Sequence, residues 1–327
     1  MTSYMSVNIG STWTRYCIAQ GDRVISFGKE RTLLIGSNTS ISRRIVSIYQ
    51  NCIKRHKAYT AGKIKLGVSF AGLVQMDGDH KCGIAANICG GLQNNIKVIP
   101  NDWTFVDFTG LFHKFDAVIV RNDVVAEMII EHLFGALVGY KHCAYLSWGT
   151  GIGSGLILDN KIVEGKRGLA GHAGHQFVTD GGKHLCGCGN TGDLESILGA
   201  RAINDATGID AKELFSRVAK HDPIALKQAD SLITTLSRGV FNLLVILDLE
   251  AVCFGGTVFN SNAKYVLAKI SQNMREFSPL FVNGVEFHQS LLFEKNVYVS
   301  GFGEIAPFNK IERWLSNCDF SSNNKSR

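Results

Sequence analysis

Residues 144–163 read AYLSWGTGIGSGLILDNKIV. The apolar segment 144–148 predicts a buried strand, residues 149–155 predict a loop with glycine at every second position, and residues 156–158 predict another strand. Asp159 and Asn160 favour a tight turn into a third strand over 161–163. We therefore expect a meander of strands whose first turn is small and glycine-rich enough to face a phosphate group.

The N-terminal part of the chain shows the same order of elements, without a match in letters. We expect strands over residues 4–9, 15–19, 23–27 and 65–70, a polar turn at Gly10-Ser11-Thr12 and a helix from residue 40. Two copies of one arrangement, each with such a turn, favour two lobes with a nucleotide held between them.

Composition places the 327-residue chain among ordinary soluble proteins, with 45% hydrophobic and 19% charged residues. The net charge of +6 suits an enzyme that attracts phosphorylated cosubstrates. Its densest cluster, residues 54–57, falls at the end of a predicted helix, where a solvated face is favoured over a nucleic-acid patch. We find no secretion signal or membrane span, and nine scattered cysteines fit a reducing compartment, so we expect a cytoplasmic protein.

Three groups of residues carry candidate chemistry. The Gly149–Gly155 loop can bring backbone N–H groups close to phosphate oxygens, although glycine-rich hairpins also occur for conformational reasons alone. Asp123 follows a predicted buried strand and opens a helix, where it can either accept a hydroxyl proton or simply cap the helix. The segment downstream ends a strand at Gly255-Gly256, which can admit a flat ligand or form a tight turn.

A further group is a cluster of possible metal ligands. His175, Cys186, Cys188 and Asp193 lie within a short glycine-rich segment and offer nitrogen, sulfur and carboxylate oxygen. Zinc accepts all three ligand types in tetrahedral geometry, and four protein ligands indicate a structural rather than a catalytic ion. The alternative is two free thiols beside unrelated histidines.

These motifs together resemble the ROK family of repressors and sugar kinases. The similarity rests on GTGIGSG at 149–155, GLAGHAGH at 168–175, CGCGNTGDLE at 186–195 and Asn122-Asp123. The resemblance implies an α/β, actin-like ATPase fold of ribonuclease-H-like lobes with a cleft between them. It also implies a homodimer, ATP with Mg²⁺, a structural Zn²⁺ and phosphorylation of a hexose 6-hydroxyl. The expected lobes are residues 1–122, rejoined by 300–327, and residues 123–299.

The resemblance also assigns roles to residues of this sequence. Asp123 is the expected catalytic base. Sugar binding is expected from Asn122, His172, His175, Glu195, Gly72 and Asn87. The nucleotide is expected to contact Asn8, Gly10, Ser11, Thr12, Gly149, Thr150, Gly151, Gly255 and Gly256.

Four positions are informative because they differ among members of the family. Most glucose and N-acetylglucosamine kinases carry Glu where this chain has His172, whereas bacterial N-acetylmannosamine kinases resemble this chain, which makes N-acetylmannosamine the leading substrate. Active relatives have Asp and Gly where this chain has Asn8 and Ser11, and a third cysteine where it has Asp193. The changes at Asn8 and Ser11 favour an alternative, a sugar-binding or regulatory protein with little turnover. A kinase for another amino sugar is a further possibility.

Overall fold

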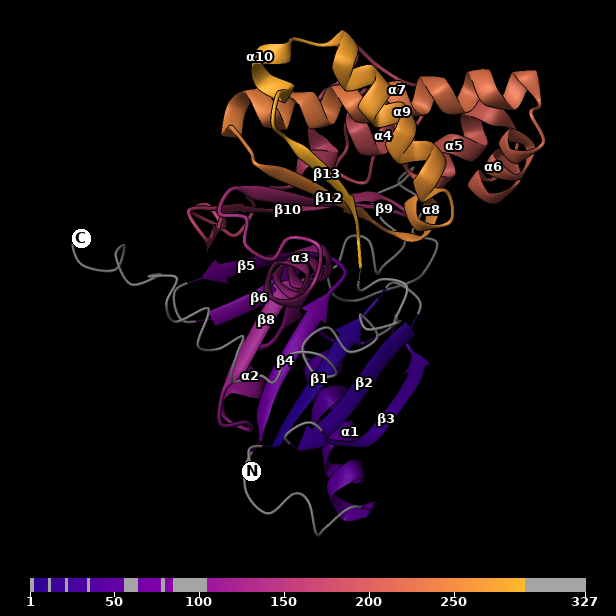
Figure 1. The fold of residues 1–327 in the computed structure, drawn as a ribbon. Helices are drawn as coiled ribbons and strands as arrows, with labels where there is room; N and C mark the ends of the chain where they lie inside the picture. The colour runs from indigo at the N-terminus through magenta and orange to yellow at the C-terminus, as the bar shows by residue number, and fades with distance from the viewer. Residues whose placement is uncertain are drawn as a thin grey trace.

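The computed structural model describes residues 3–10, 13–20, 23–33, 36–55, 64–77, 80–84 and 105–291 (Figure 1). The first part of the chain forms β1 (Ser3–Ile9), β2 (Trp13–Gln20), β3 (Arg23–Arg31), α1 (Ser40–Arg55), β4 (Lys65–Phe70), β5 (Leu73–Asp77), β6 (His80–Ile84), β7 (Phe105–Asp107), α2 (Thr109–Phe112) and β8 (Val118–Asn122). The second part forms α3 (Asp123–Phe134), β9 (Cys143–Trp148), β10 (Ile152–Leu158), β11 (Lys161–Ile162), η3 (Ala173–His175), α4 (Leu194–Leu198), α5 (Ala200–Thr207), α6 (Ala211–Ala219), α7 (Pro223–Leu247), β12 (Ala251–Gly255), α8 (Thr257–Asn260), α9 (Ala263–Glu276), α10 (Pro279–Val282) and β13 (Glu286–Gln289).

Two five-stranded sheets have the same topology. The first has the order β3-β2-β1-β4-β8 and the second the order β11-β10-β9-β12-β13. In each sheet three antiparallel strands form a meander. The first of these strands pairs in parallel with a later strand, and that strand pairs in parallel with the last one. The predicted structural repeat is therefore confirmed, and a small sheet of order β5-β6-β7 is an addition to it.

Apolar periodicity explains how each sheet is covered. The buried residues Ile41, Ile45 and Ile48 recur along one face of α1 and join the core of the first sheet. On the second sheet, α4, α5, α6, α7 and α9 share a core with β9, β10 and β12, and Figure 1 shows these helices in a layer beyond that sheet.

Helix α7 is long and apolar enough to cross a membrane by length and composition. Asp222 caps it through the backbone N–H groups of Ile224 and Ala225, and Pro223 opens it. Its residues Leu232, Ile233 and Leu236 belong to the core of the second sheet, so it has the position of a core helix.

Helix α3 lies between the two sheets, as Figure 1 shows, and contacts β4 and β8 of the first and β9 and β10 of the second. The predicted loop over residues 149–155 was wrong in its extent, because β10 already begins at Ile152. The packing of α3 on β10 explains the glycines in this strand. A Cβ atom on Gly153 would lie 2.4 Å from Cγ2 of Val124, and one on Gly155 would lie 2.8 Å from Sδ of Met128. These two glycines belong to the strand and give α3 room to pack on it.

The expected lobe limits stay a prediction. The described strands of the first sheet end at Asn122 and those of the second begin at Cys143, with α3 between them. The proposed return of residues 300–327 to the first lobe falls outside the described residues.

Candidate active site

Asn122 joins the end of strand β8 to the turn after β4. Its side-chain oxygen accepts hydrogen bonds from the N–H groups of Val124 (3.0 Å) and Val125 (3.3 Å), so Asn122 is the N-cap of α3. Its side-chain nitrogen donates to the carbonyl oxygen of Gly72 over 2.9 Å. Two of the expected sugar-binding residues, Asn122 and Gly72, are thus in contact.

Asp123 is the first residue of α3, not its cap. The cap position belongs to Asn122, so the interpretation of Asp123 as a mere N-cap is wrong. The Asp123 side chain is partly buried and accepts a hydrogen bond from the N–H of Val124 over 3.0 Å. Burial raises the pKa of Asp123 to about 6, against the opposing effect of the Val124 N–H and Asn122. A carboxylate with a pKa this close to neutrality is suited to accept a proton from a hydroxyl group.

The turn at Gly149-Thr150-Gly151 joins β9 to β10 and is closed by a 3.0 Å hydrogen bond from the N–H of Gly149 to the carbonyl of Gly151. A Cβ atom on Gly151 would lie 2.2 Å from Oε2 of Glu195, which also accepts the N–H of Ile152 over 3.0 Å. The expected phosphate turn and an expected sugar-binding carboxylate are therefore in direct contact.

The end of β12 completes the same region. Gly256 adopts a φ of +90°, and a Cβ atom there would lie 2.4 Å from the carbonyl oxygen of Trp148, so only glycine fits without strain. A Cβ on Gly149 would lie 3.3 Å from Oγ1 of Thr257. The two segments of the second lobe that were expected to contact the nucleotide, 149–151 and 255–256, thus lie side by side.

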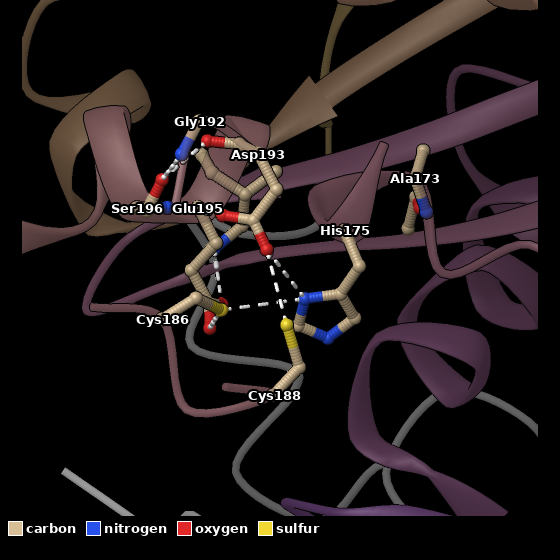
Figure 2. A network of polar contacts seen from close by, with 10 residues as sticks. Ala173, His175, Cys186, Cys188, Gly192, Asp193, Glu195 and Ser196 are labelled. Carbon is tan, nitrogen blue, oxygen red and sulfur yellow. Dashed lines mark hydrogen bonds and ion pairs between the residues drawn. The ribbon is translucent and has the colours of Figure 1, made fainter. Parts of the chain in front are cut away.

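His175, Cys186, Cys188 and Asp193 form one cluster, in which the ligand atoms all lie within 4.8 Å of one another. Figure 2 shows the four side chains pointing toward one another. Asp193 Oδ2 lies 3.2 Å from Cys188 Sγ and 3.5 Å from His175 Nδ1, and Cys186 Sγ lies 3.5 Å from that nitrogen. The sequence prediction that these residues gather is confirmed.

The donor set fits a zinc ion. Ligand bonds of about 2.0–2.3 Å in tetrahedral geometry separate neighbouring ligand atoms by roughly 3.3–3.8 Å, which is close to the contacts observed. Although burial opposes its ionisation, hydrogen bonds from His175, the N–H of Ser196 and Cys188 hold the pKa of Asp193 at about 2. Oδ1 of Asp193 accepts the N–H of Ser196 over 2.8 Å as the N-cap of α4, which leaves Oδ2 directed at the cluster. The same residue can therefore cap a helix and ligate a metal.

Glu195 links this cluster to the phosphate turn. Its Oε1 accepts a hydrogen bond from Cys186 Sγ over 3.3 Å, while its Oε2 accepts the N–H of Ile152. A metal held by the cluster would bind Cys186 as a thiolate, which cannot donate this hydrogen bond, so Glu195 would keep its bond to the N–H of Ile152.

His172 precedes η3, and its ring centroid lies 6.4 Å from that of His175. Burial and the neighbouring His175 lower the pKa of His172, so the ring is neutral near pH 7. The buried hydroxyl of Ser154 on β10 fixes this loop, since it accepts the N–H of Ala173 over 2.8 Å and donates to the carbonyl of Gly171. The sequence analysis did not single out this role of Ser154.

In the first lobe, Asn8 lies near the end of β1 and donates to the hydroxyl of Ser69 over 2.8 Å. Gly10 begins the turn to β2, its N–H donating to the carbonyl of Trp13 over 3.1 Å. Ser11, Thr12 and Asn87 were expected to contact ligands and lie outside the described residues.

The sequence analysis missed two charged groups near Asp123. Arg121 of β8 forms an ion pair with Glu164, 3.2 Å away in the segment after β11, and thereby joins the first sheet to the segment that leads to His172. Glu127 lies one turn after Asp123 on α3, with a buried Oε2 atom that has no hydrogen-bond partner among the described residues. The sequence could have indicated this residue, because an acidic side chain four positions after Asp123 lies on the same face of a mostly apolar helix.

Comparison with known proteins agrees with this arrangement. The model of the ROK family matches residues 4–287. A glucokinase from Aeropyrum pernix is 25% identical over 305 residues, which cover 85% of this chain and 89% of that protein. An N-acetylmannosamine kinase from Haemophilus influenzae is 27% identical over 179 residues, or 53% of this chain and 59% of that protein.

The fold is also shared with solved structures. The crystal structure of a ROK family transcriptional regulator, a homolog of the Escherichia coli MLC protein, has a TM-score of 0.75 at 19% identity and covers 97% of this chain and 79% of that one. The expected α/β, actin-like ATPase fold with two lobes is confirmed. The chain belongs to the ROK family.

Proposed function

We propose that the protein is an ATP-dependent kinase that phosphorylates the 6-hydroxyl of a hexose or amino sugar, with N-acetylmannosamine as the leading substrate. The observation that carries the proposal is Asp123, a partly buried carboxylate with a pKa of about 6 at the start of α3, between the two sheets. ROK relatives that bear kinase names support this activity.

In the proposed reaction, Asp123 accepts the proton of the sugar 6-hydroxyl while the oxygen of that hydroxyl bonds to the γ-phosphorus of ATP. The bond between that phosphorus and the bridging oxygen of the β-phosphate breaks, and ADP leaves with the electron pair. Backbone N–H groups of the 149–151 turn and residues 255–256 bind the nucleotide in the second lobe, and Asn8 and Gly10 face it from the first. Mg²⁺ would supply charge neutralisation for the triphosphate.

Zinc would act as a structural ion in this scheme. His175, Cys186, Cys188 and Asp193 would hold it, and no position of the cluster is left open for a reacting water. Its contribution is to order the loop that carries His172, His175 and Glu195, which we propose as sugar ligands beside Asn122 and Gly72.

We further propose a cytoplasmic homodimer that binds neither nucleic acid nor a membrane. Support for the dimer comes from large apolar side chains exposed on the second lobe, among them Phe177 (62%) and Leu280 (81%). Phe177, Phe241 and Phe277 line a hollow of about 480 Å³ there. A surface of this kind is typical of a protein interface. A Leu280→Asp variant that sediments as a monomer, where the parent protein sediments as a dimer, would support it.

A regulatory sugar-binding protein is the second candidate. Asn8 lacks the charge that its expected role near Mg²⁺ calls for, and the fold is shared with a ROK transcriptional regulator. The two candidates differ in turnover, whereas both predict sugar binding.

A screen of sugar-dependent ATP consumption tests the proposal. The substrates are glucose, mannose and their 2-acetamido and 2-amino forms, with Asp123→Asn as the control for contaminating kinases. We expect ADP release with N-acetylmannosamine above that with N-acetylglucosamine. Sugar binding by calorimetry without ADP release from any of these sugars would instead support the regulatory protein.

A further inference from the structure

Glu127 is a partly buried acidic residue to which the proposed mechanism gives no role. It lies four residues after Asp123 on α3, and residues at this spacing share one face of a helix. Oε2 of Glu127 is buried and has no hydrogen-bond partner among the described residues. A buried carboxylate oxygen without a partner is costly as a charged group.

The groups around Glu127 offer it no positive charge within the described part of the chain. Asp123 and Glu131 act on it from α3, and the hydroxyls of Tyr145 and Ser147 face it from β9. Cys253 of β12 is a further titratable neighbour, and burial raises the pKa of this thiol well above its usual value, so the thiol is neutral. Glu127 therefore sits among acids and neutral groups.

Close packing keeps α3 and β9 against each other. The contact of Val124 with Gly153 described above fixes the first turn of α3 on the second sheet. The Tyr145 hydroxyl occupies the space beside Gly255, where a Cβ atom would lie 2.0 Å from it. Tyr145 thus lies between the end of β12 and Glu127, so the acidic pair is close to the segment proposed to bind the nucleotide.

Two carboxyl groups placed this way cannot both ionise without a large electrostatic cost. Burial raises the pKa of Glu127 to about 8, and the Asp123 carboxylate adds to the effect, against the opposing effect of the Tyr145 and Ser147 hydroxyls. Burial raises the pKa of Asp123 only to about 6. Between these values the pair binds one proton. Asp123 accepts the N–H of Val124 over 3.0 Å, whereas Oε2 of Glu127 accepts no hydrogen bond among the described residues, which favours the proton on Glu127.

We propose that Glu127 is a positioning residue for phosphoryl transfer, whose carboxyl group holds the single proton of the Asp123–Glu127 pair and so leaves Asp123 ionised to act as the base. This inference rests on the proposed kinase function. The proton on Glu127 is not consumed, because the proton released by the sugar hydroxyl goes to Asp123. Ionisation of Glu127 would place a second negative charge beside the site of the triphosphate.

The first test is a carboxyl ¹³C NMR titration of the protein without ligands. We expect the Glu127 signal to titrate near pH 8 in the parent protein and at lower pH in Asp123→Asn, because the neighbouring charge is gone. The Glu127→Gln variant assigns the signal, and Glu213→Gln is the matched control on the exposed face of α6. The inference is overturned if Glu127 is already ionised at pH 7, or if its titration midpoint is the same in the parent protein and in Asp123→Asn. Either result holds whether or not the protein is a kinase.

The second test is the pH profile of kcat/KM for sugar phosphorylation. We expect the parent enzyme to lose activity above pH 8, by about tenfold at pH 9, as Glu127 ionises. In Glu127→Gln this alkaline fall should be absent, whereas Glu213→Gln should keep it. An alkaline fall retained in Glu127→Gln counts against the role of Glu127 but not against the kinase. Absence of turnover by the parent protein counts against the kinase, and the NMR titration then decides on the shared proton.

Discussion

The side-chain amide of Asn8 donates a hydrogen bond to the hydroxyl oxygen of Ser69 over 2.8 Å, from β1 to its parallel neighbour β4. An aspartate at position 8 could keep this contact, because the Ser69 hydroxyl can donate to a carboxylate as well as accept from an amide. The side chain at position 8 can therefore gain a charge without loss of its link to β4.

Asn8→Asp should lower the Mg²⁺ concentration needed for half-maximal activity and raise kcat at limiting Mg²⁺, since Mg²⁺ favours anionic oxygen ligands. A tenfold gain corresponds to about 1.4 kcal/mol of the activation barrier. Initial rates over a Mg²⁺ series measure it, with Ser69→Ala as the control that breaks the contact without adding charge. Equal Mg²⁺ curves for the parent and Asn8→Asp would show that the missing charge does not matter.

Asp123→Asn should lower kcat by about 10²–10⁴-fold, the range expected for loss of a general base. In the parent enzyme, kcat/KM should fall as the pH drops through about 6, because the protonated carboxyl cannot accept a proton. A stably folded variant with parental kcat would refute the role of Asp123 as the base.

The same substitution should stabilise the fold near neutral pH. The pKa of Asp123 is raised from 3.8 to about 6 on folding, so its favourable contribution exists below pH 3.8 and is lost as the pH rises through 6. Each pKa unit corresponds to about 1.4 kcal/mol, and we expect a gain of roughly 1–3 kcal/mol in unfolding free energy at pH 7. Urea denaturation of both proteins at pH 4 and pH 7 measures it, and the difference should shrink at pH 4.

Sequence patterns predicted most of the fold because the two meanders and the apolar faces of α1 and α7 are local signals. The predicted boundary of β10 was wrong because the glycines at 153 and 155 make room for helix α3 and do not form a turn. Contact with α3 cannot be seen in the local pattern of the strand. Glu127 was missed although its spacing from Asp123 on one helix face is a local signal. Its significance depends on which neighbours of β9 and β12 face it, and such neighbours are set by tertiary packing.

Zinc binding can be separated from helix capping at Asp193. Asp193→Asn keeps a good N-cap for α4 but loses the anionic ligand, whereas Asp193→Cys supplies a thiolate and loses the cap, at a cost of about 1 kcal/mol. We expect about one zinc per chain in the parent protein, less in Asp193→Asn, and tighter binding in Asp193→Cys. Metal analysis and Tm with and without chelator measure these effects. If the parent protein contains no zinc and its Tm does not change with chelator, the residues of the cluster are free thiols and unrelated histidines.

His172→Glu should narrow or reverse the preference for N-acetylmannosamine over N-acetylglucosamine. The neutral imidazole can donate one hydrogen bond and accept another, whereas an ionised glutamate only accepts, and the two sugars differ in the direction of the acetamido group. The ratio of kcat/KM for the two sugars measures the change. Identical ratios in both proteins would exclude His172 from specificity.

Gly153→Ala should weaken both stability and catalysis, because the new methyl group would lie 2.4 Å from Cγ2 of Val124, the residue next to Asp123. Overpacking of this kind typically costs about 1–3 kcal/mol. It should displace the first turn of α3 and lower kcat more than KM changes. Gly181→Ala is the matched control, since nothing lies within 4 Å of the added Cβ. A double variant with Val124→Ala removes the clashing methyl groups and should recover much of the stability and kcat. If the double variant is no better than Gly153→Ala alone, the contact between α3 and β10 does not position Asp123.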